Sequence, residues 1–449
     1  VRQMSKQNDS AAAGSSRRSF LAASAAGVGA AALLGRPPIT KASIPFVSEQ
    51  PELTPPAAGS KKLRIGVVGL GGPGGCAMGL NHCLSMIELS KQGRENCEIA
   101  AICDLNDIFL EGGRQKIDSA QSGSVQTFRH HKDLLAVKDL DGILIAVPEH
   151  WHAGVAIDCI EAGKDVYIEK PMTLNLEQAV ALYNVANKHP NVIAQVGTQM
   201  TRLPKYYAAQ KLIKDGSIGV PTFSQTSYCR NSKKGEWHYT IDDRWKPGEN
   251  LDWDAWCGPM GAMPWDPKVY YQWRRYRKVS TGIIGDLLVH VMTPMMMALD
   301  QGWPTKVVAT GAHHSDKAME NFDNINLAVQ FETGHQMMVA GSTCNENGLE
   351  TLIRGTKGNL YLNSAHCVLR PERIWAEDVE EQTVRCPDIG NDQDVHRLGW
   401  MHSIRTRNKP DSSVELGMKV MVVVDLATRS MWEGKAFTFD PKTMQSASL

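Results

Sequence analysis

A glycine-rich loop that directly follows a short apolar segment constrains the fold of this chain more than any other feature. Residues 63–68 read LRIGVV, a run suited to a buried parallel strand, and residues 69–74 read GLGGPG. A strand, a glycine turn and a helix start in this order are typical of dinucleotide-binding folds, because the helix N-terminus receives a pyrophosphate. We therefore expect Gly69, Gly71 and Gly74 to bind a nucleotide. The alternative is a glycine-rich surface turn.

Predicted strands and helices alternate behind this loop. The predicted strands are residues 97–103, 141–147 and 165–168, and residues 153–162 predict a helix. Such alternation is typical of a parallel sheet covered by helices, here a Rossmann domain. Beyond about residue 220 the pattern changes, and residues 325–331 and 336–340 alternate like the half-buried strands of a hairpin. We therefore expect an α/β chain with an N-terminal Rossmann domain and a C-terminal α+β domain whose sheet is mostly antiparallel.

The N-terminal segment has the pattern of a twin-arginine export signal. Residues 16–21 read SRRSFL, and an apolar, alanine-rich run follows as far as Leu34. Such signals are removed, and this run is too short to span a bilayer comfortably. The predicted organisation is a signal over residues 1–42, a linker over 43–60, the Rossmann domain over 61–185 and a substrate and oligomerisation domain over 186–449. We expect a periplasmic or secreted protein with no membrane span after signal removal.

The composition argues against several classes of partner. Lys and Arg together number 48, as do Asp and Glu, so the chain has no charge excess that would favour nucleic acid or an anionic membrane. None of the ten cysteines is spaced as C-x-x-C, and His130 and His131 lack partner ligands at metal spacing. We therefore expect neither a nucleic-acid partner nor a bound metal.

An acidic residue, Asp104, ends the second predicted strand. A carboxylate at this position can accept hydrogen bonds from the adenosine ribose and repels a 2′-phosphate, so it favours NAD over NADP. The spacing from Gly69 is longer than the roughly 20 residues usual for this motif, which a longer first helix explains. The alternative is a solvated acidic residue at a strand end.

Two further predicted strands end in candidate cofactor residues. Glu169 and Lys170 directly follow one of these strands, and Pro148 and His152 follow the other. Ligands of open α/β sheets bind at the carboxyl ends of the strands, so we expect all four residues at the cofactor. The Lys170 side chain can also reach a substrate hydroxyl. For His152 a structural role fits as well.

Asp286 and His290 lie four residues apart, so on a helix they share one face. Histidine is the usual general base near neutral pH, so we expect His290 to take a substrate proton and Asp286 to hold the substrate or orient the ring. Activity should then fall as the pH drops through the usual histidine range. The alternative is a helix-capping Asp and a buried His with satisfied hydrogen bonds.

An aromatic and basic cluster lies between residues 237 and 276. The apolar faces of sugars stack on aromatic rings, and Arg can bind a carboxylate with two hydrogen bonds. We therefore name Trp273, Arg274, Tyr276 and His238 as candidate substrate contacts. Packing between domains or a subunit interface would explain the cluster equally well.

Several of these motifs occur in the order of one known family. Residues 147–152 (VPEHWH), 162–171 (AGKDVYIEKP) and 195–199 (QVGTQ), with the glycine loop, closely resemble the glucose–fructose oxidoreductase/inositol dehydrogenase (Gfo/Idh/MocA) family. The resemblance covers nearly the whole chain after the signal. It implies bound NAD(P), a large open sheet in the C-terminal domain and a sugar-like substrate between the domains.

The resemblance also implies roles for three residues. It assigns a catalytic role to Lys170 and matches the family's Asp-x-x-x-His pair to Asp286 and His290. The chain departs from the family pattern at Leu288, where Gly is usual, and near Pro294, where an Asp often follows the His. These changes bear on the substrate more than on the chemistry.

We expect an exported NAD-dependent oxidoreductase that acts on a carbohydrate hydroxyl, with Lys170 polarising the oxygen and Asp286 holding the substrate. The cofactor should be tightly retained, because an exported enzyme meets little free NAD. A redox-neutral glycosidase or lyase that oxidises its sugar transiently is the alternative, and the intact Lys170 favours the oxidoreductase. A non-catalytic sugar-binding protein is a third interpretation. We also expect a homo-oligomer, either a dimer or a tetramer.

Overall fold

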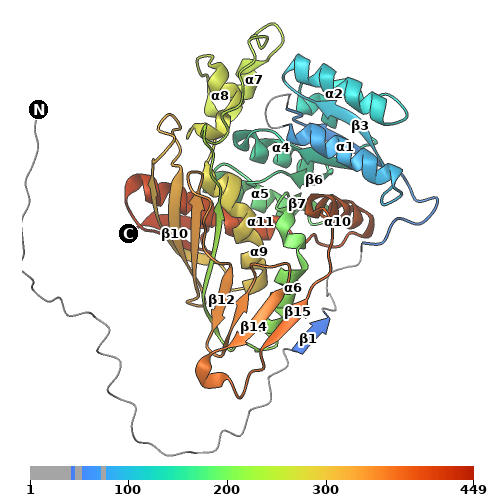
Figure 1. The fold of residues 1–449 in the computed structure, drawn as a ribbon. Coiled ribbons are helices and arrows are strands. Elements are labelled where there is room, and N and C mark those ends of the chain that lie inside the picture. The colour runs from blue at the N-terminus through green and yellow to red at the C-terminus, as the bar shows by residue number, and fades with distance from the viewer. Residues whose placement is uncertain (1–41, 46–52, 72–76) are drawn as a thin grey trace, which may run out of the picture. The chain divides into compact units, whose positions relative to one another are not determined.

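The computed structural model describes residues 42–45, 53–71 and 77–449. The expected export signal lies outside these residues except for Ala42, and so does Gly74 of the glycine loop. The described chain is built on two sheets, one of six strands and one of eleven (Figure 1). This confirms the predicted α/β fold class.

The first sheet is parallel throughout, as the alternating pattern predicts. Its strands are β2 (Leu63–Val68), β3 (Cys97–Cys103), β4 (Gln126–Phe128), β5 (Gly142–Ile145), β6 (Asp165–Ile168) and β7 (Ala194–Val196). The connecting helices are α1 (Met78–Lys91), α2 (Asp107–Ala120), α3 (His131–Leu135), α4 (Glu149–Glu161) and α5 (Leu176–Lys188). The strand order β4-β3-β2-β5-β6-β7 is that of a Rossmann fold. The carboxyl ends of β2, β3, β5 and β6 therefore meet at one edge.

Two predicted elements of this sheet differ in their bounds. β5 ends at Ile145 rather than at Val147, and α4 begins at Glu149 rather than at Ala153. Pro148 accounts for the start of α4, because its extended backbone and fixed φ of −61° suit the position directly before a helix. The segment between β5 and α4 is therefore short and places its residues at the sheet edge.

The second sheet is mostly antiparallel. Its strands are β1 (Ala42–Pro45), β8 (Pro221–Cys229), β9 (Pro304–Ala312), β10 (Asn324–Phe331), β11 (Gln336–Ser342), β12 (Leu352–Gly355), β13 (Gly358–Tyr361), β14 (Cys367–Pro371), β15 (Gln382–Arg385), β16 (Phe437–Asp440) and β17 (Gln445–Ser448). Only the pairs β1–β15 and β8–β11 run parallel among these described strands. β10 and β11 form the predicted hairpin, and β10 alternates buried and exposed residues, so one face of the sheet is covered.

Three helices cover that face: α6 (Pro204–Lys214), α9 (Val289–Leu299) and α11 (Val414–Glu433) (Figure 1). Two short helices, α7 (Trp253–Cys257) and α8 (Pro267–Tyr271), lie in a segment that projects beside α2 and α4 (Figure 1). The last helix outside these groups, α10 (Asp392–Thr406), packs beside α1 on the first sheet. Gly142 of β5 permits this, since a Cβ there would lie 2.9 Å from the Trp400 ring.

The boundary between the two halves is less simple than the sequence predicts. β7 is a strand of the first sheet, and α10 packs against that sheet. Both elements lie beyond residue 185, the expected end of the Rossmann domain. Part of the expected linker over residues 43–60 also differs, since β1 pairs with β15. The edge strand of a sheet has unpaired backbone groups, and an extended segment can pair with them.

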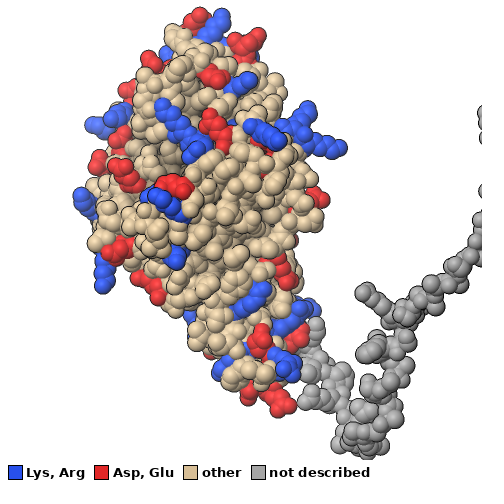
Figure 2. Space-filling model, turned by 90° about the vertical axis from the view of Figure 1, so that its left-hand side faces the viewer, with Lys and Arg blue, Asp and Glu red and all other residues tan. Residues whose placement is uncertain are grey.

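On the face that Figure 2 shows, Lys and Arg side chains are interspersed with Asp and Glu, and neither sign gathers into a patch. Among the described residues, no helix combines the length and apolar character that crossing a membrane requires. The cysteines within the same residues all carry free thiols.

Candidate active site

The described part of the glycine loop has the backbone shape of a phosphate cradle. Gly69 and Gly71 have φ of 85° and 67°, a region that other residues avoid. A Cβ on Gly69 would lie 2.8 Å from the Ala146 carbonyl group, and one on Gly79 would lie 1.8 Å from the Gly69 carbonyl oxygen. Glycine therefore lets the loop pass close to β5 and to the first turn of α1. This cradle fits a dinucleotide whose pyrophosphate lies at the N-terminus of α1.

Asp104 follows β3 and is hydrogen-bonded to the glycine loop. Its Oδ2 accepts from the amides of Leu70 at 2.8 Å and Gly71 at 3.3 Å, and its Oδ1 accepts from the Asn106 amide at 2.9 Å. Burial raises the pKa of the Asp104 carboxyl, and these amide donors oppose the rise. The carboxyl group is thus fixed beside the loop, where it would face the adenosine ribose of a bound dinucleotide.

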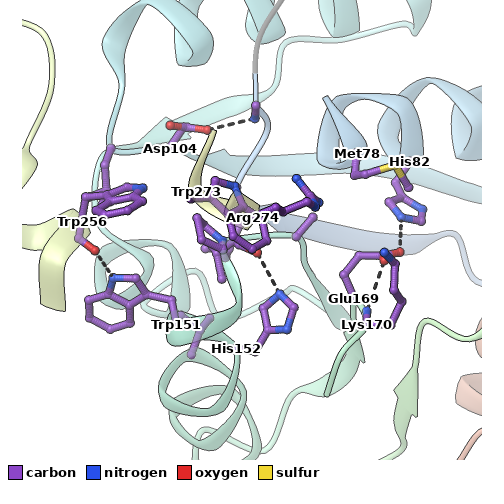
Figure 3. Close-up of a pocket in the computed structure, with 18 of the residues that line it drawn as sticks. Met78, His82, Asp104, Trp151, His152, Glu169, Lys170, Trp256, Trp273 and Arg274 are labelled. Atoms are coloured by element: carbon purple, nitrogen blue, oxygen red, sulfur yellow. Dashed lines mark hydrogen bonds and ion pairs between the residues drawn. The ribbon is translucent and has the colours of Figure 1, made fainter. Parts of the chain in front are cut away.

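A cavity of about 710 Å³ runs from this loop into the second half of the chain. Asp104 lies on one side of it, and Glu169 and Lys170 lie on the other (Figure 3). The predicted site residues that line the cavity are Gly69, Gly71, Asp104, Pro148, His152, Glu169, Lys170, Trp273, Arg274, Asp286 and His290. The fold therefore brings most of the candidates into one site.

Asp286 holds the Lys170 ammonium. The Lys170 Nζ donates to the Oδ1 and to the backbone carbonyl of Asp286, each at 2.9 Å, and the Arg274 Nε donates to the same Oδ1 at 2.7 Å. Burial would raise the pKa of Asp286, but the two cations outweigh burial and hold that pKa well below its usual range. Asp286 is therefore a permanent carboxylate. One of its oxygens already binds two protein cations instead of a substrate.

The backbone that carries Asp286 is a π-helical turn. It spans Ile284–Leu288 and leads directly into α9, so the predicted helix is wider here than an α-helix. Gly285 permits close packing, since a Cβ there would lie 3.1 Å from the Pro171 ring. Such turns are frequent at functional sites. Asp286 and His290 both line the cavity, so the wider turn still presents both to the same space.

His290 lies at the cavity wall as a neutral imidazole. Burial, together with the nearby Lys170 cation, lowers the pKa of His290 to about 3. Within the described residues its Nδ1 has no hydrogen-bond partner, and its ring centroid lies 6.0 Å from that of Tyr228. The ring is therefore neutral throughout the usual histidine range. The structure therefore does not support the prediction that protonation of His290 lowers the activity as the pH drops through that range.

Glu169 and His152 lie where the strand ends meet. Burial favours protonation of Glu169, but the hydrogen bond with His82 and the nearby Lys170 cation together outweigh it, and the pKa of Glu169 falls to about 2. The two ring nitrogens of His152 lie 2.6 Å and 2.8 Å from the carbonyl oxygens of Pro171 and Val147. His152 therefore connects the segments that follow β5 and β6, which supports its structural role, although it also lines the cavity.

The aromatic cluster is largely a packed core at the cavity wall. Its buried rings pack with Phe109 of α2, and they are Trp245, Trp253, Trp256, Tyr270 and Tyr271. The Tyr270 hydroxyl accepts from the Asn106 amide group at 3.0 Å, and the Trp256 carbonyl accepts from the Trp151 Nε1 at 3.0 Å (Figure 3). These bonds join the segment around α7 and α8 to the first sheet. Packing within the chain therefore accounts for much of the cluster.

Two of the four predicted substrate contacts lie away from the cavity. His238 is exposed and Tyr276 packs against the aromatic core, and the described residues that line the cavity include neither. Trp237 has a φ of 53° and is only 5% exposed, so the sharp turn there places Trp237 inside and His238 outside. Trp273 and Arg274 do line the cavity, with the guanidinium carbon 4.1 Å from a ring centroid.

Glu149 is a buried carboxyl group that is not among the predicted site residues. It accepts from the Ser280 hydroxyl at 2.6 Å and from the backbone amide and hydroxyl of Thr281, both at 2.8 Å. Burial raises its pKa to about 7. Glu149 thereby ties the first turn of α4 to the segment that enters the π-helical turn. An acidic residue in an otherwise apolar strand-to-helix connection was the available signal.

Both halves of the chain match known family profiles. Residues 63–198 match the oxidoreductase family with an NAD-binding Rossmann fold, and residues 262–439 match the C-terminal alpha/beta domain of the same oxidoreductase family. An inositol 2-dehydrogenase of Corynebacterium glutamicum is 31% identical over 160 residues, 36% of this chain and 43% of that protein. A levoglucosan dehydrogenase of Pseudarthrobacter phenanthrenivorans is 28% identical over 155 residues, 34% of this chain and 32% of that protein. The matched stretches thus span less than half of these relatives.

Solved structures with low sequence identity share the fold. A levoglucosan dehydrogenase in complex with NADH and levoglucosan has a TM-score of 0.62 and 18% identity, covering 86% of this chain and 99% of that chain. An aldose–aldose oxidoreductase from Caulobacter crescentus, complexed with glycerol, has a TM-score of 0.62 and 17% identity, covering 84% of this chain and 100% of that chain. With both of its halves matched, this chain belongs to the Gfo/Idh/MocA family of oxidoreductases and carries that family's NAD-binding Rossmann domain.

Proposed function

We propose that this chain is an NAD-dependent oxidoreductase that acts on a hydroxyl group of a sugar or sugar derivative. One observation carries the proposal: a single cavity holds the glycine cradle and Asp104 at one end and Lys170 and a neutral His290 at the other. The first pair fits a dinucleotide, and the second pair has the charge and the proton acceptor that alcohol oxidation needs.

Each residue of the reacting end has a distinct task in this proposal. His290 takes the proton of the substrate hydroxyl, and the Lys170 ammonium donates a hydrogen bond to the same oxygen as negative charge develops on it. NAD, held by Gly69, Gly71 and Asp104, would supply the acceptor for the hydride that leaves the carbon. Asp286 holds the Lys170 side chain in place, and it binds Arg274 as well. Asp286 is thus a positioning residue in addition to lining the cavity.

The substrate class we favour is a cyclic compound with several hydroxyl groups. Trp273 and Trp237 give the cavity aromatic surface, and sugar faces stack on such rings. The curated relatives are named for inositol and levoglucosan, both of them ring compounds of this class. Arg274 adds a cation beside Trp273.

Tight retention of the cofactor forms a second part of the proposal. The segment around α7 and α8 lines the cavity through Trp256, Tyr270 and Tyr271, next to Asp104. In this proposal the segment covers part of the bound dinucleotide and slows its release. Denaturing the purified protein and measuring the released NAD(H) tests this, with near-stoichiometric release expected and cofactor-free protein as the contrary result.

Export is the third part, and it is supported by the sequence of residues 16–21. The test compares the full chain with a variant carrying Arg17→Lys and Arg18→Lys in a bacterium that has the twin-arginine route. The wild type should reach the periplasm and the variant should remain in the cytoplasm. Equal distribution of the two proteins would contradict the proposal.

A substrate screen tests the activity itself. The full chain is incubated with NAD and a panel of inositols, anhydrosugars, aldoses and aryl glycosides, while NADH absorbance and aglycone release are followed. NADH formation with at least one polyol or sugar is the expected result. Aglycone release without net NADH would instead establish the redox-neutral glycosidase alternative.

A further inference from the structure

A line of buried polar side chains lies behind Glu169, and its members come from three distant segments. His82 is on α1, Glu169 follows β6, and Arg397 is on α10. The His82 Nε2 lies 2.8 Å from the Glu169 Oε1, and the Arg397 Nε donates to the His82 Nδ1 at 2.8 Å. Asp394, one turn earlier on α10, accepts from the Arg397 Nη1 at 2.6 Å. These contacts form one continuous chain of hydrogen bonds.

Arg397 fixes the protonation of the His82 ring. A guanidinium can only donate, so the His82 Nδ1 must accept, and the single proton of a neutral ring must lie on Nε2. Burial lowers the pKa of His82, which keeps the ring neutral. The Nε2–H bond then points at Glu169, as the contact between the two residues in Figure 3 shows. A 180° flip of the imidazole ring would break both of these hydrogen bonds.

Glu169 is the last of these hydrogen-bonded side chains, and it lines the cavity. Its Oε1 accepts from His82, and its Oε2 lies 3.2 Å from the Lys170 backbone amide. The Tyr167 side chain also hydrogen-bonds to Glu169. The two carboxylate oxygens together can accept about four hydrogen bonds, so Glu169 retains acceptor capacity toward the cavity that it lines. His82 and Arg397 are 1% and 2% exposed, so water does not compete for their bonds.

The position of Glu169 in the cavity determines which hydrogen-bond donor of a bound dinucleotide it can contact. Asp104 marks the adenosine end of the cavity, the start of α1 marks the pyrophosphate, and Glu169 lies beside Lys170 at the reacting end. The hydroxyl donors nearest the reacting end of a bound dinucleotide are those of the nicotinamide ribose. We propose that Arg397 and His82 are positioning residues that hold Glu169 as the hydrogen-bond acceptor for this ribose.

This inference rests on NAD binding in the cavity and does not depend on which sugar is oxidised. It gives α10 a role beyond packing. α10 follows most strands of the second sheet in the chain but docks on the first sheet, so correct docking of the C-terminal half sets the geometry of the cofactor site. Arg397 connects α10 to the cofactor site through its hydrogen bond to His82.

Two substitutions of His82 separate positioning from packing. The amide of His82→Gln reaches the place of Nε2 and can still donate to Glu169. The amide of His82→Asn reaches the place of Nδ1, so it can accept from Arg397 but cannot donate to Glu169. Release of bound NADH from the full chain is measured by fluorescence after dilution into excess NAD. We expect His82→Asn to release NADH about tenfold faster than His82→Gln. His335→Gln, at a buried histidine of the second sheet, is the matched control.

Equal release rates from the two His82 variants would overturn the proposal, because a packing role does not distinguish them. No sugar is present, so the outcome is independent of the proposed reaction. If either variant fails to fold, nitrogen NMR of the histidine-labelled wild-type chain gives a second test. The spectrum should show His82 with its proton on Nε2 and with a bare Nδ1, and Arg397→Met should abolish this single tautomer. A wild-type ring protonated on Nδ1 would overturn the proposal.

Discussion

The Lys170 ammonium lies 2.9 Å from the Asp286 carboxylate, and the two side chains are 12% and 6% exposed. Lys170 follows β6 of the first sheet, whereas Asp286 lies in the π-helical turn before α9. A buried ion pair loses the solvation of both charges, so each partner depends strongly on the other. The reacting end of the cavity is therefore complete only when both halves of the chain are folded and docked.

Asp286→Asn should be strongly destabilising, although it preserves the shape of the side chain. It leaves the Lys170 and Arg274 cations buried without their counter-charge, which we expect to lower the free energy of unfolding by about 3 kcal/mol. Urea unfolding measures this. Asp215→Asn removes one partner of the exposed Lys211 pair and should cost no more than about 0.5 kcal/mol. Similar losses in both variants would contradict the role of Asp286.

The pH profile of kcat/KM should show no acidic limb from His290 between pH 8 and 5. Burial and the Lys170 cation lower its pKa to about 3, so the imidazole is already neutral in this range. The measurement is best made in a Glu149→Gln background, because Glu149 has a pKa of about 7. The contrary result is an acidic limb near the ordinary histidine pKa that is present in the wild type and absent in His290→Ala. It would show that the His290 ring becomes protonated between pH 8 and 5.

Glu149 should make the protein less stable as the pH rises from about 4.5 to about 7. Its pKa is 4.5 in the ordinary state and about 7 when folded, so between these values the folded chain binds more protons than the unfolded chain. This costs about 3 kcal/mol, and the effect should level off above pH 7. Urea unfolding of wild type and Glu149→Gln across this range tests it, with exposed Glu161→Gln as control. The same pH dependence in all three proteins would contradict the assignment.

The wild-type chain should bind NAD more tightly than NADP, because the Asp104 carboxylate repels a 2′-phosphate. Asp104→Ser should narrow the ratio of the two dissociation constants by at least about tenfold. It should also weaken NAD binding, since Asp104 accepts hydrogen bonds from the amides of Leu70 and Gly71. Calorimetry with both cofactors measures the ratio. An unchanged ratio would remove Asp104 from cofactor selection.

The first sheet was predictable because its signals are local. β3 and β6 have the bounds that their apolar runs predict, and Gly69 and Gly71 have the positive φ that the glycine loop requires. Lys170, Asp286 and His290 were found from motifs and spacing, and all three line the cavity. Each of these features depends on residues that are close in the sequence.

The remaining features depend on contacts between distant segments. Arg397 and His82 are 315 residues apart, and neither belongs to a motif that names the other. Glu149 depends on Ser280 and Thr281, which only the docked fold places beside α4. The wrong placement of His238 has a similar origin, because Trp237, which has a positive φ, is buried in a core built from distant segments. Such contacts cannot be predicted from the spacing of residues along the sequence.

Deuterium transfer tests the central claim most directly. The full chain is incubated with NAD and ring-deuterated polyols and anhydrosugars, and the cofactor is analysed by mass spectrometry. Lys188→Ala, at an exposed lysine of α5, serves as the control for Lys170→Ala. We expect deuterium to pass from a carbinol carbon of at least one substrate to the cofactor in wild type and in the control, and Lys170→Ala to slow the transfer by about 100-fold or more. Substrate turnover without deuterium in the cofactor, or equal transfer by Lys170→Ala and wild type, would contradict the account.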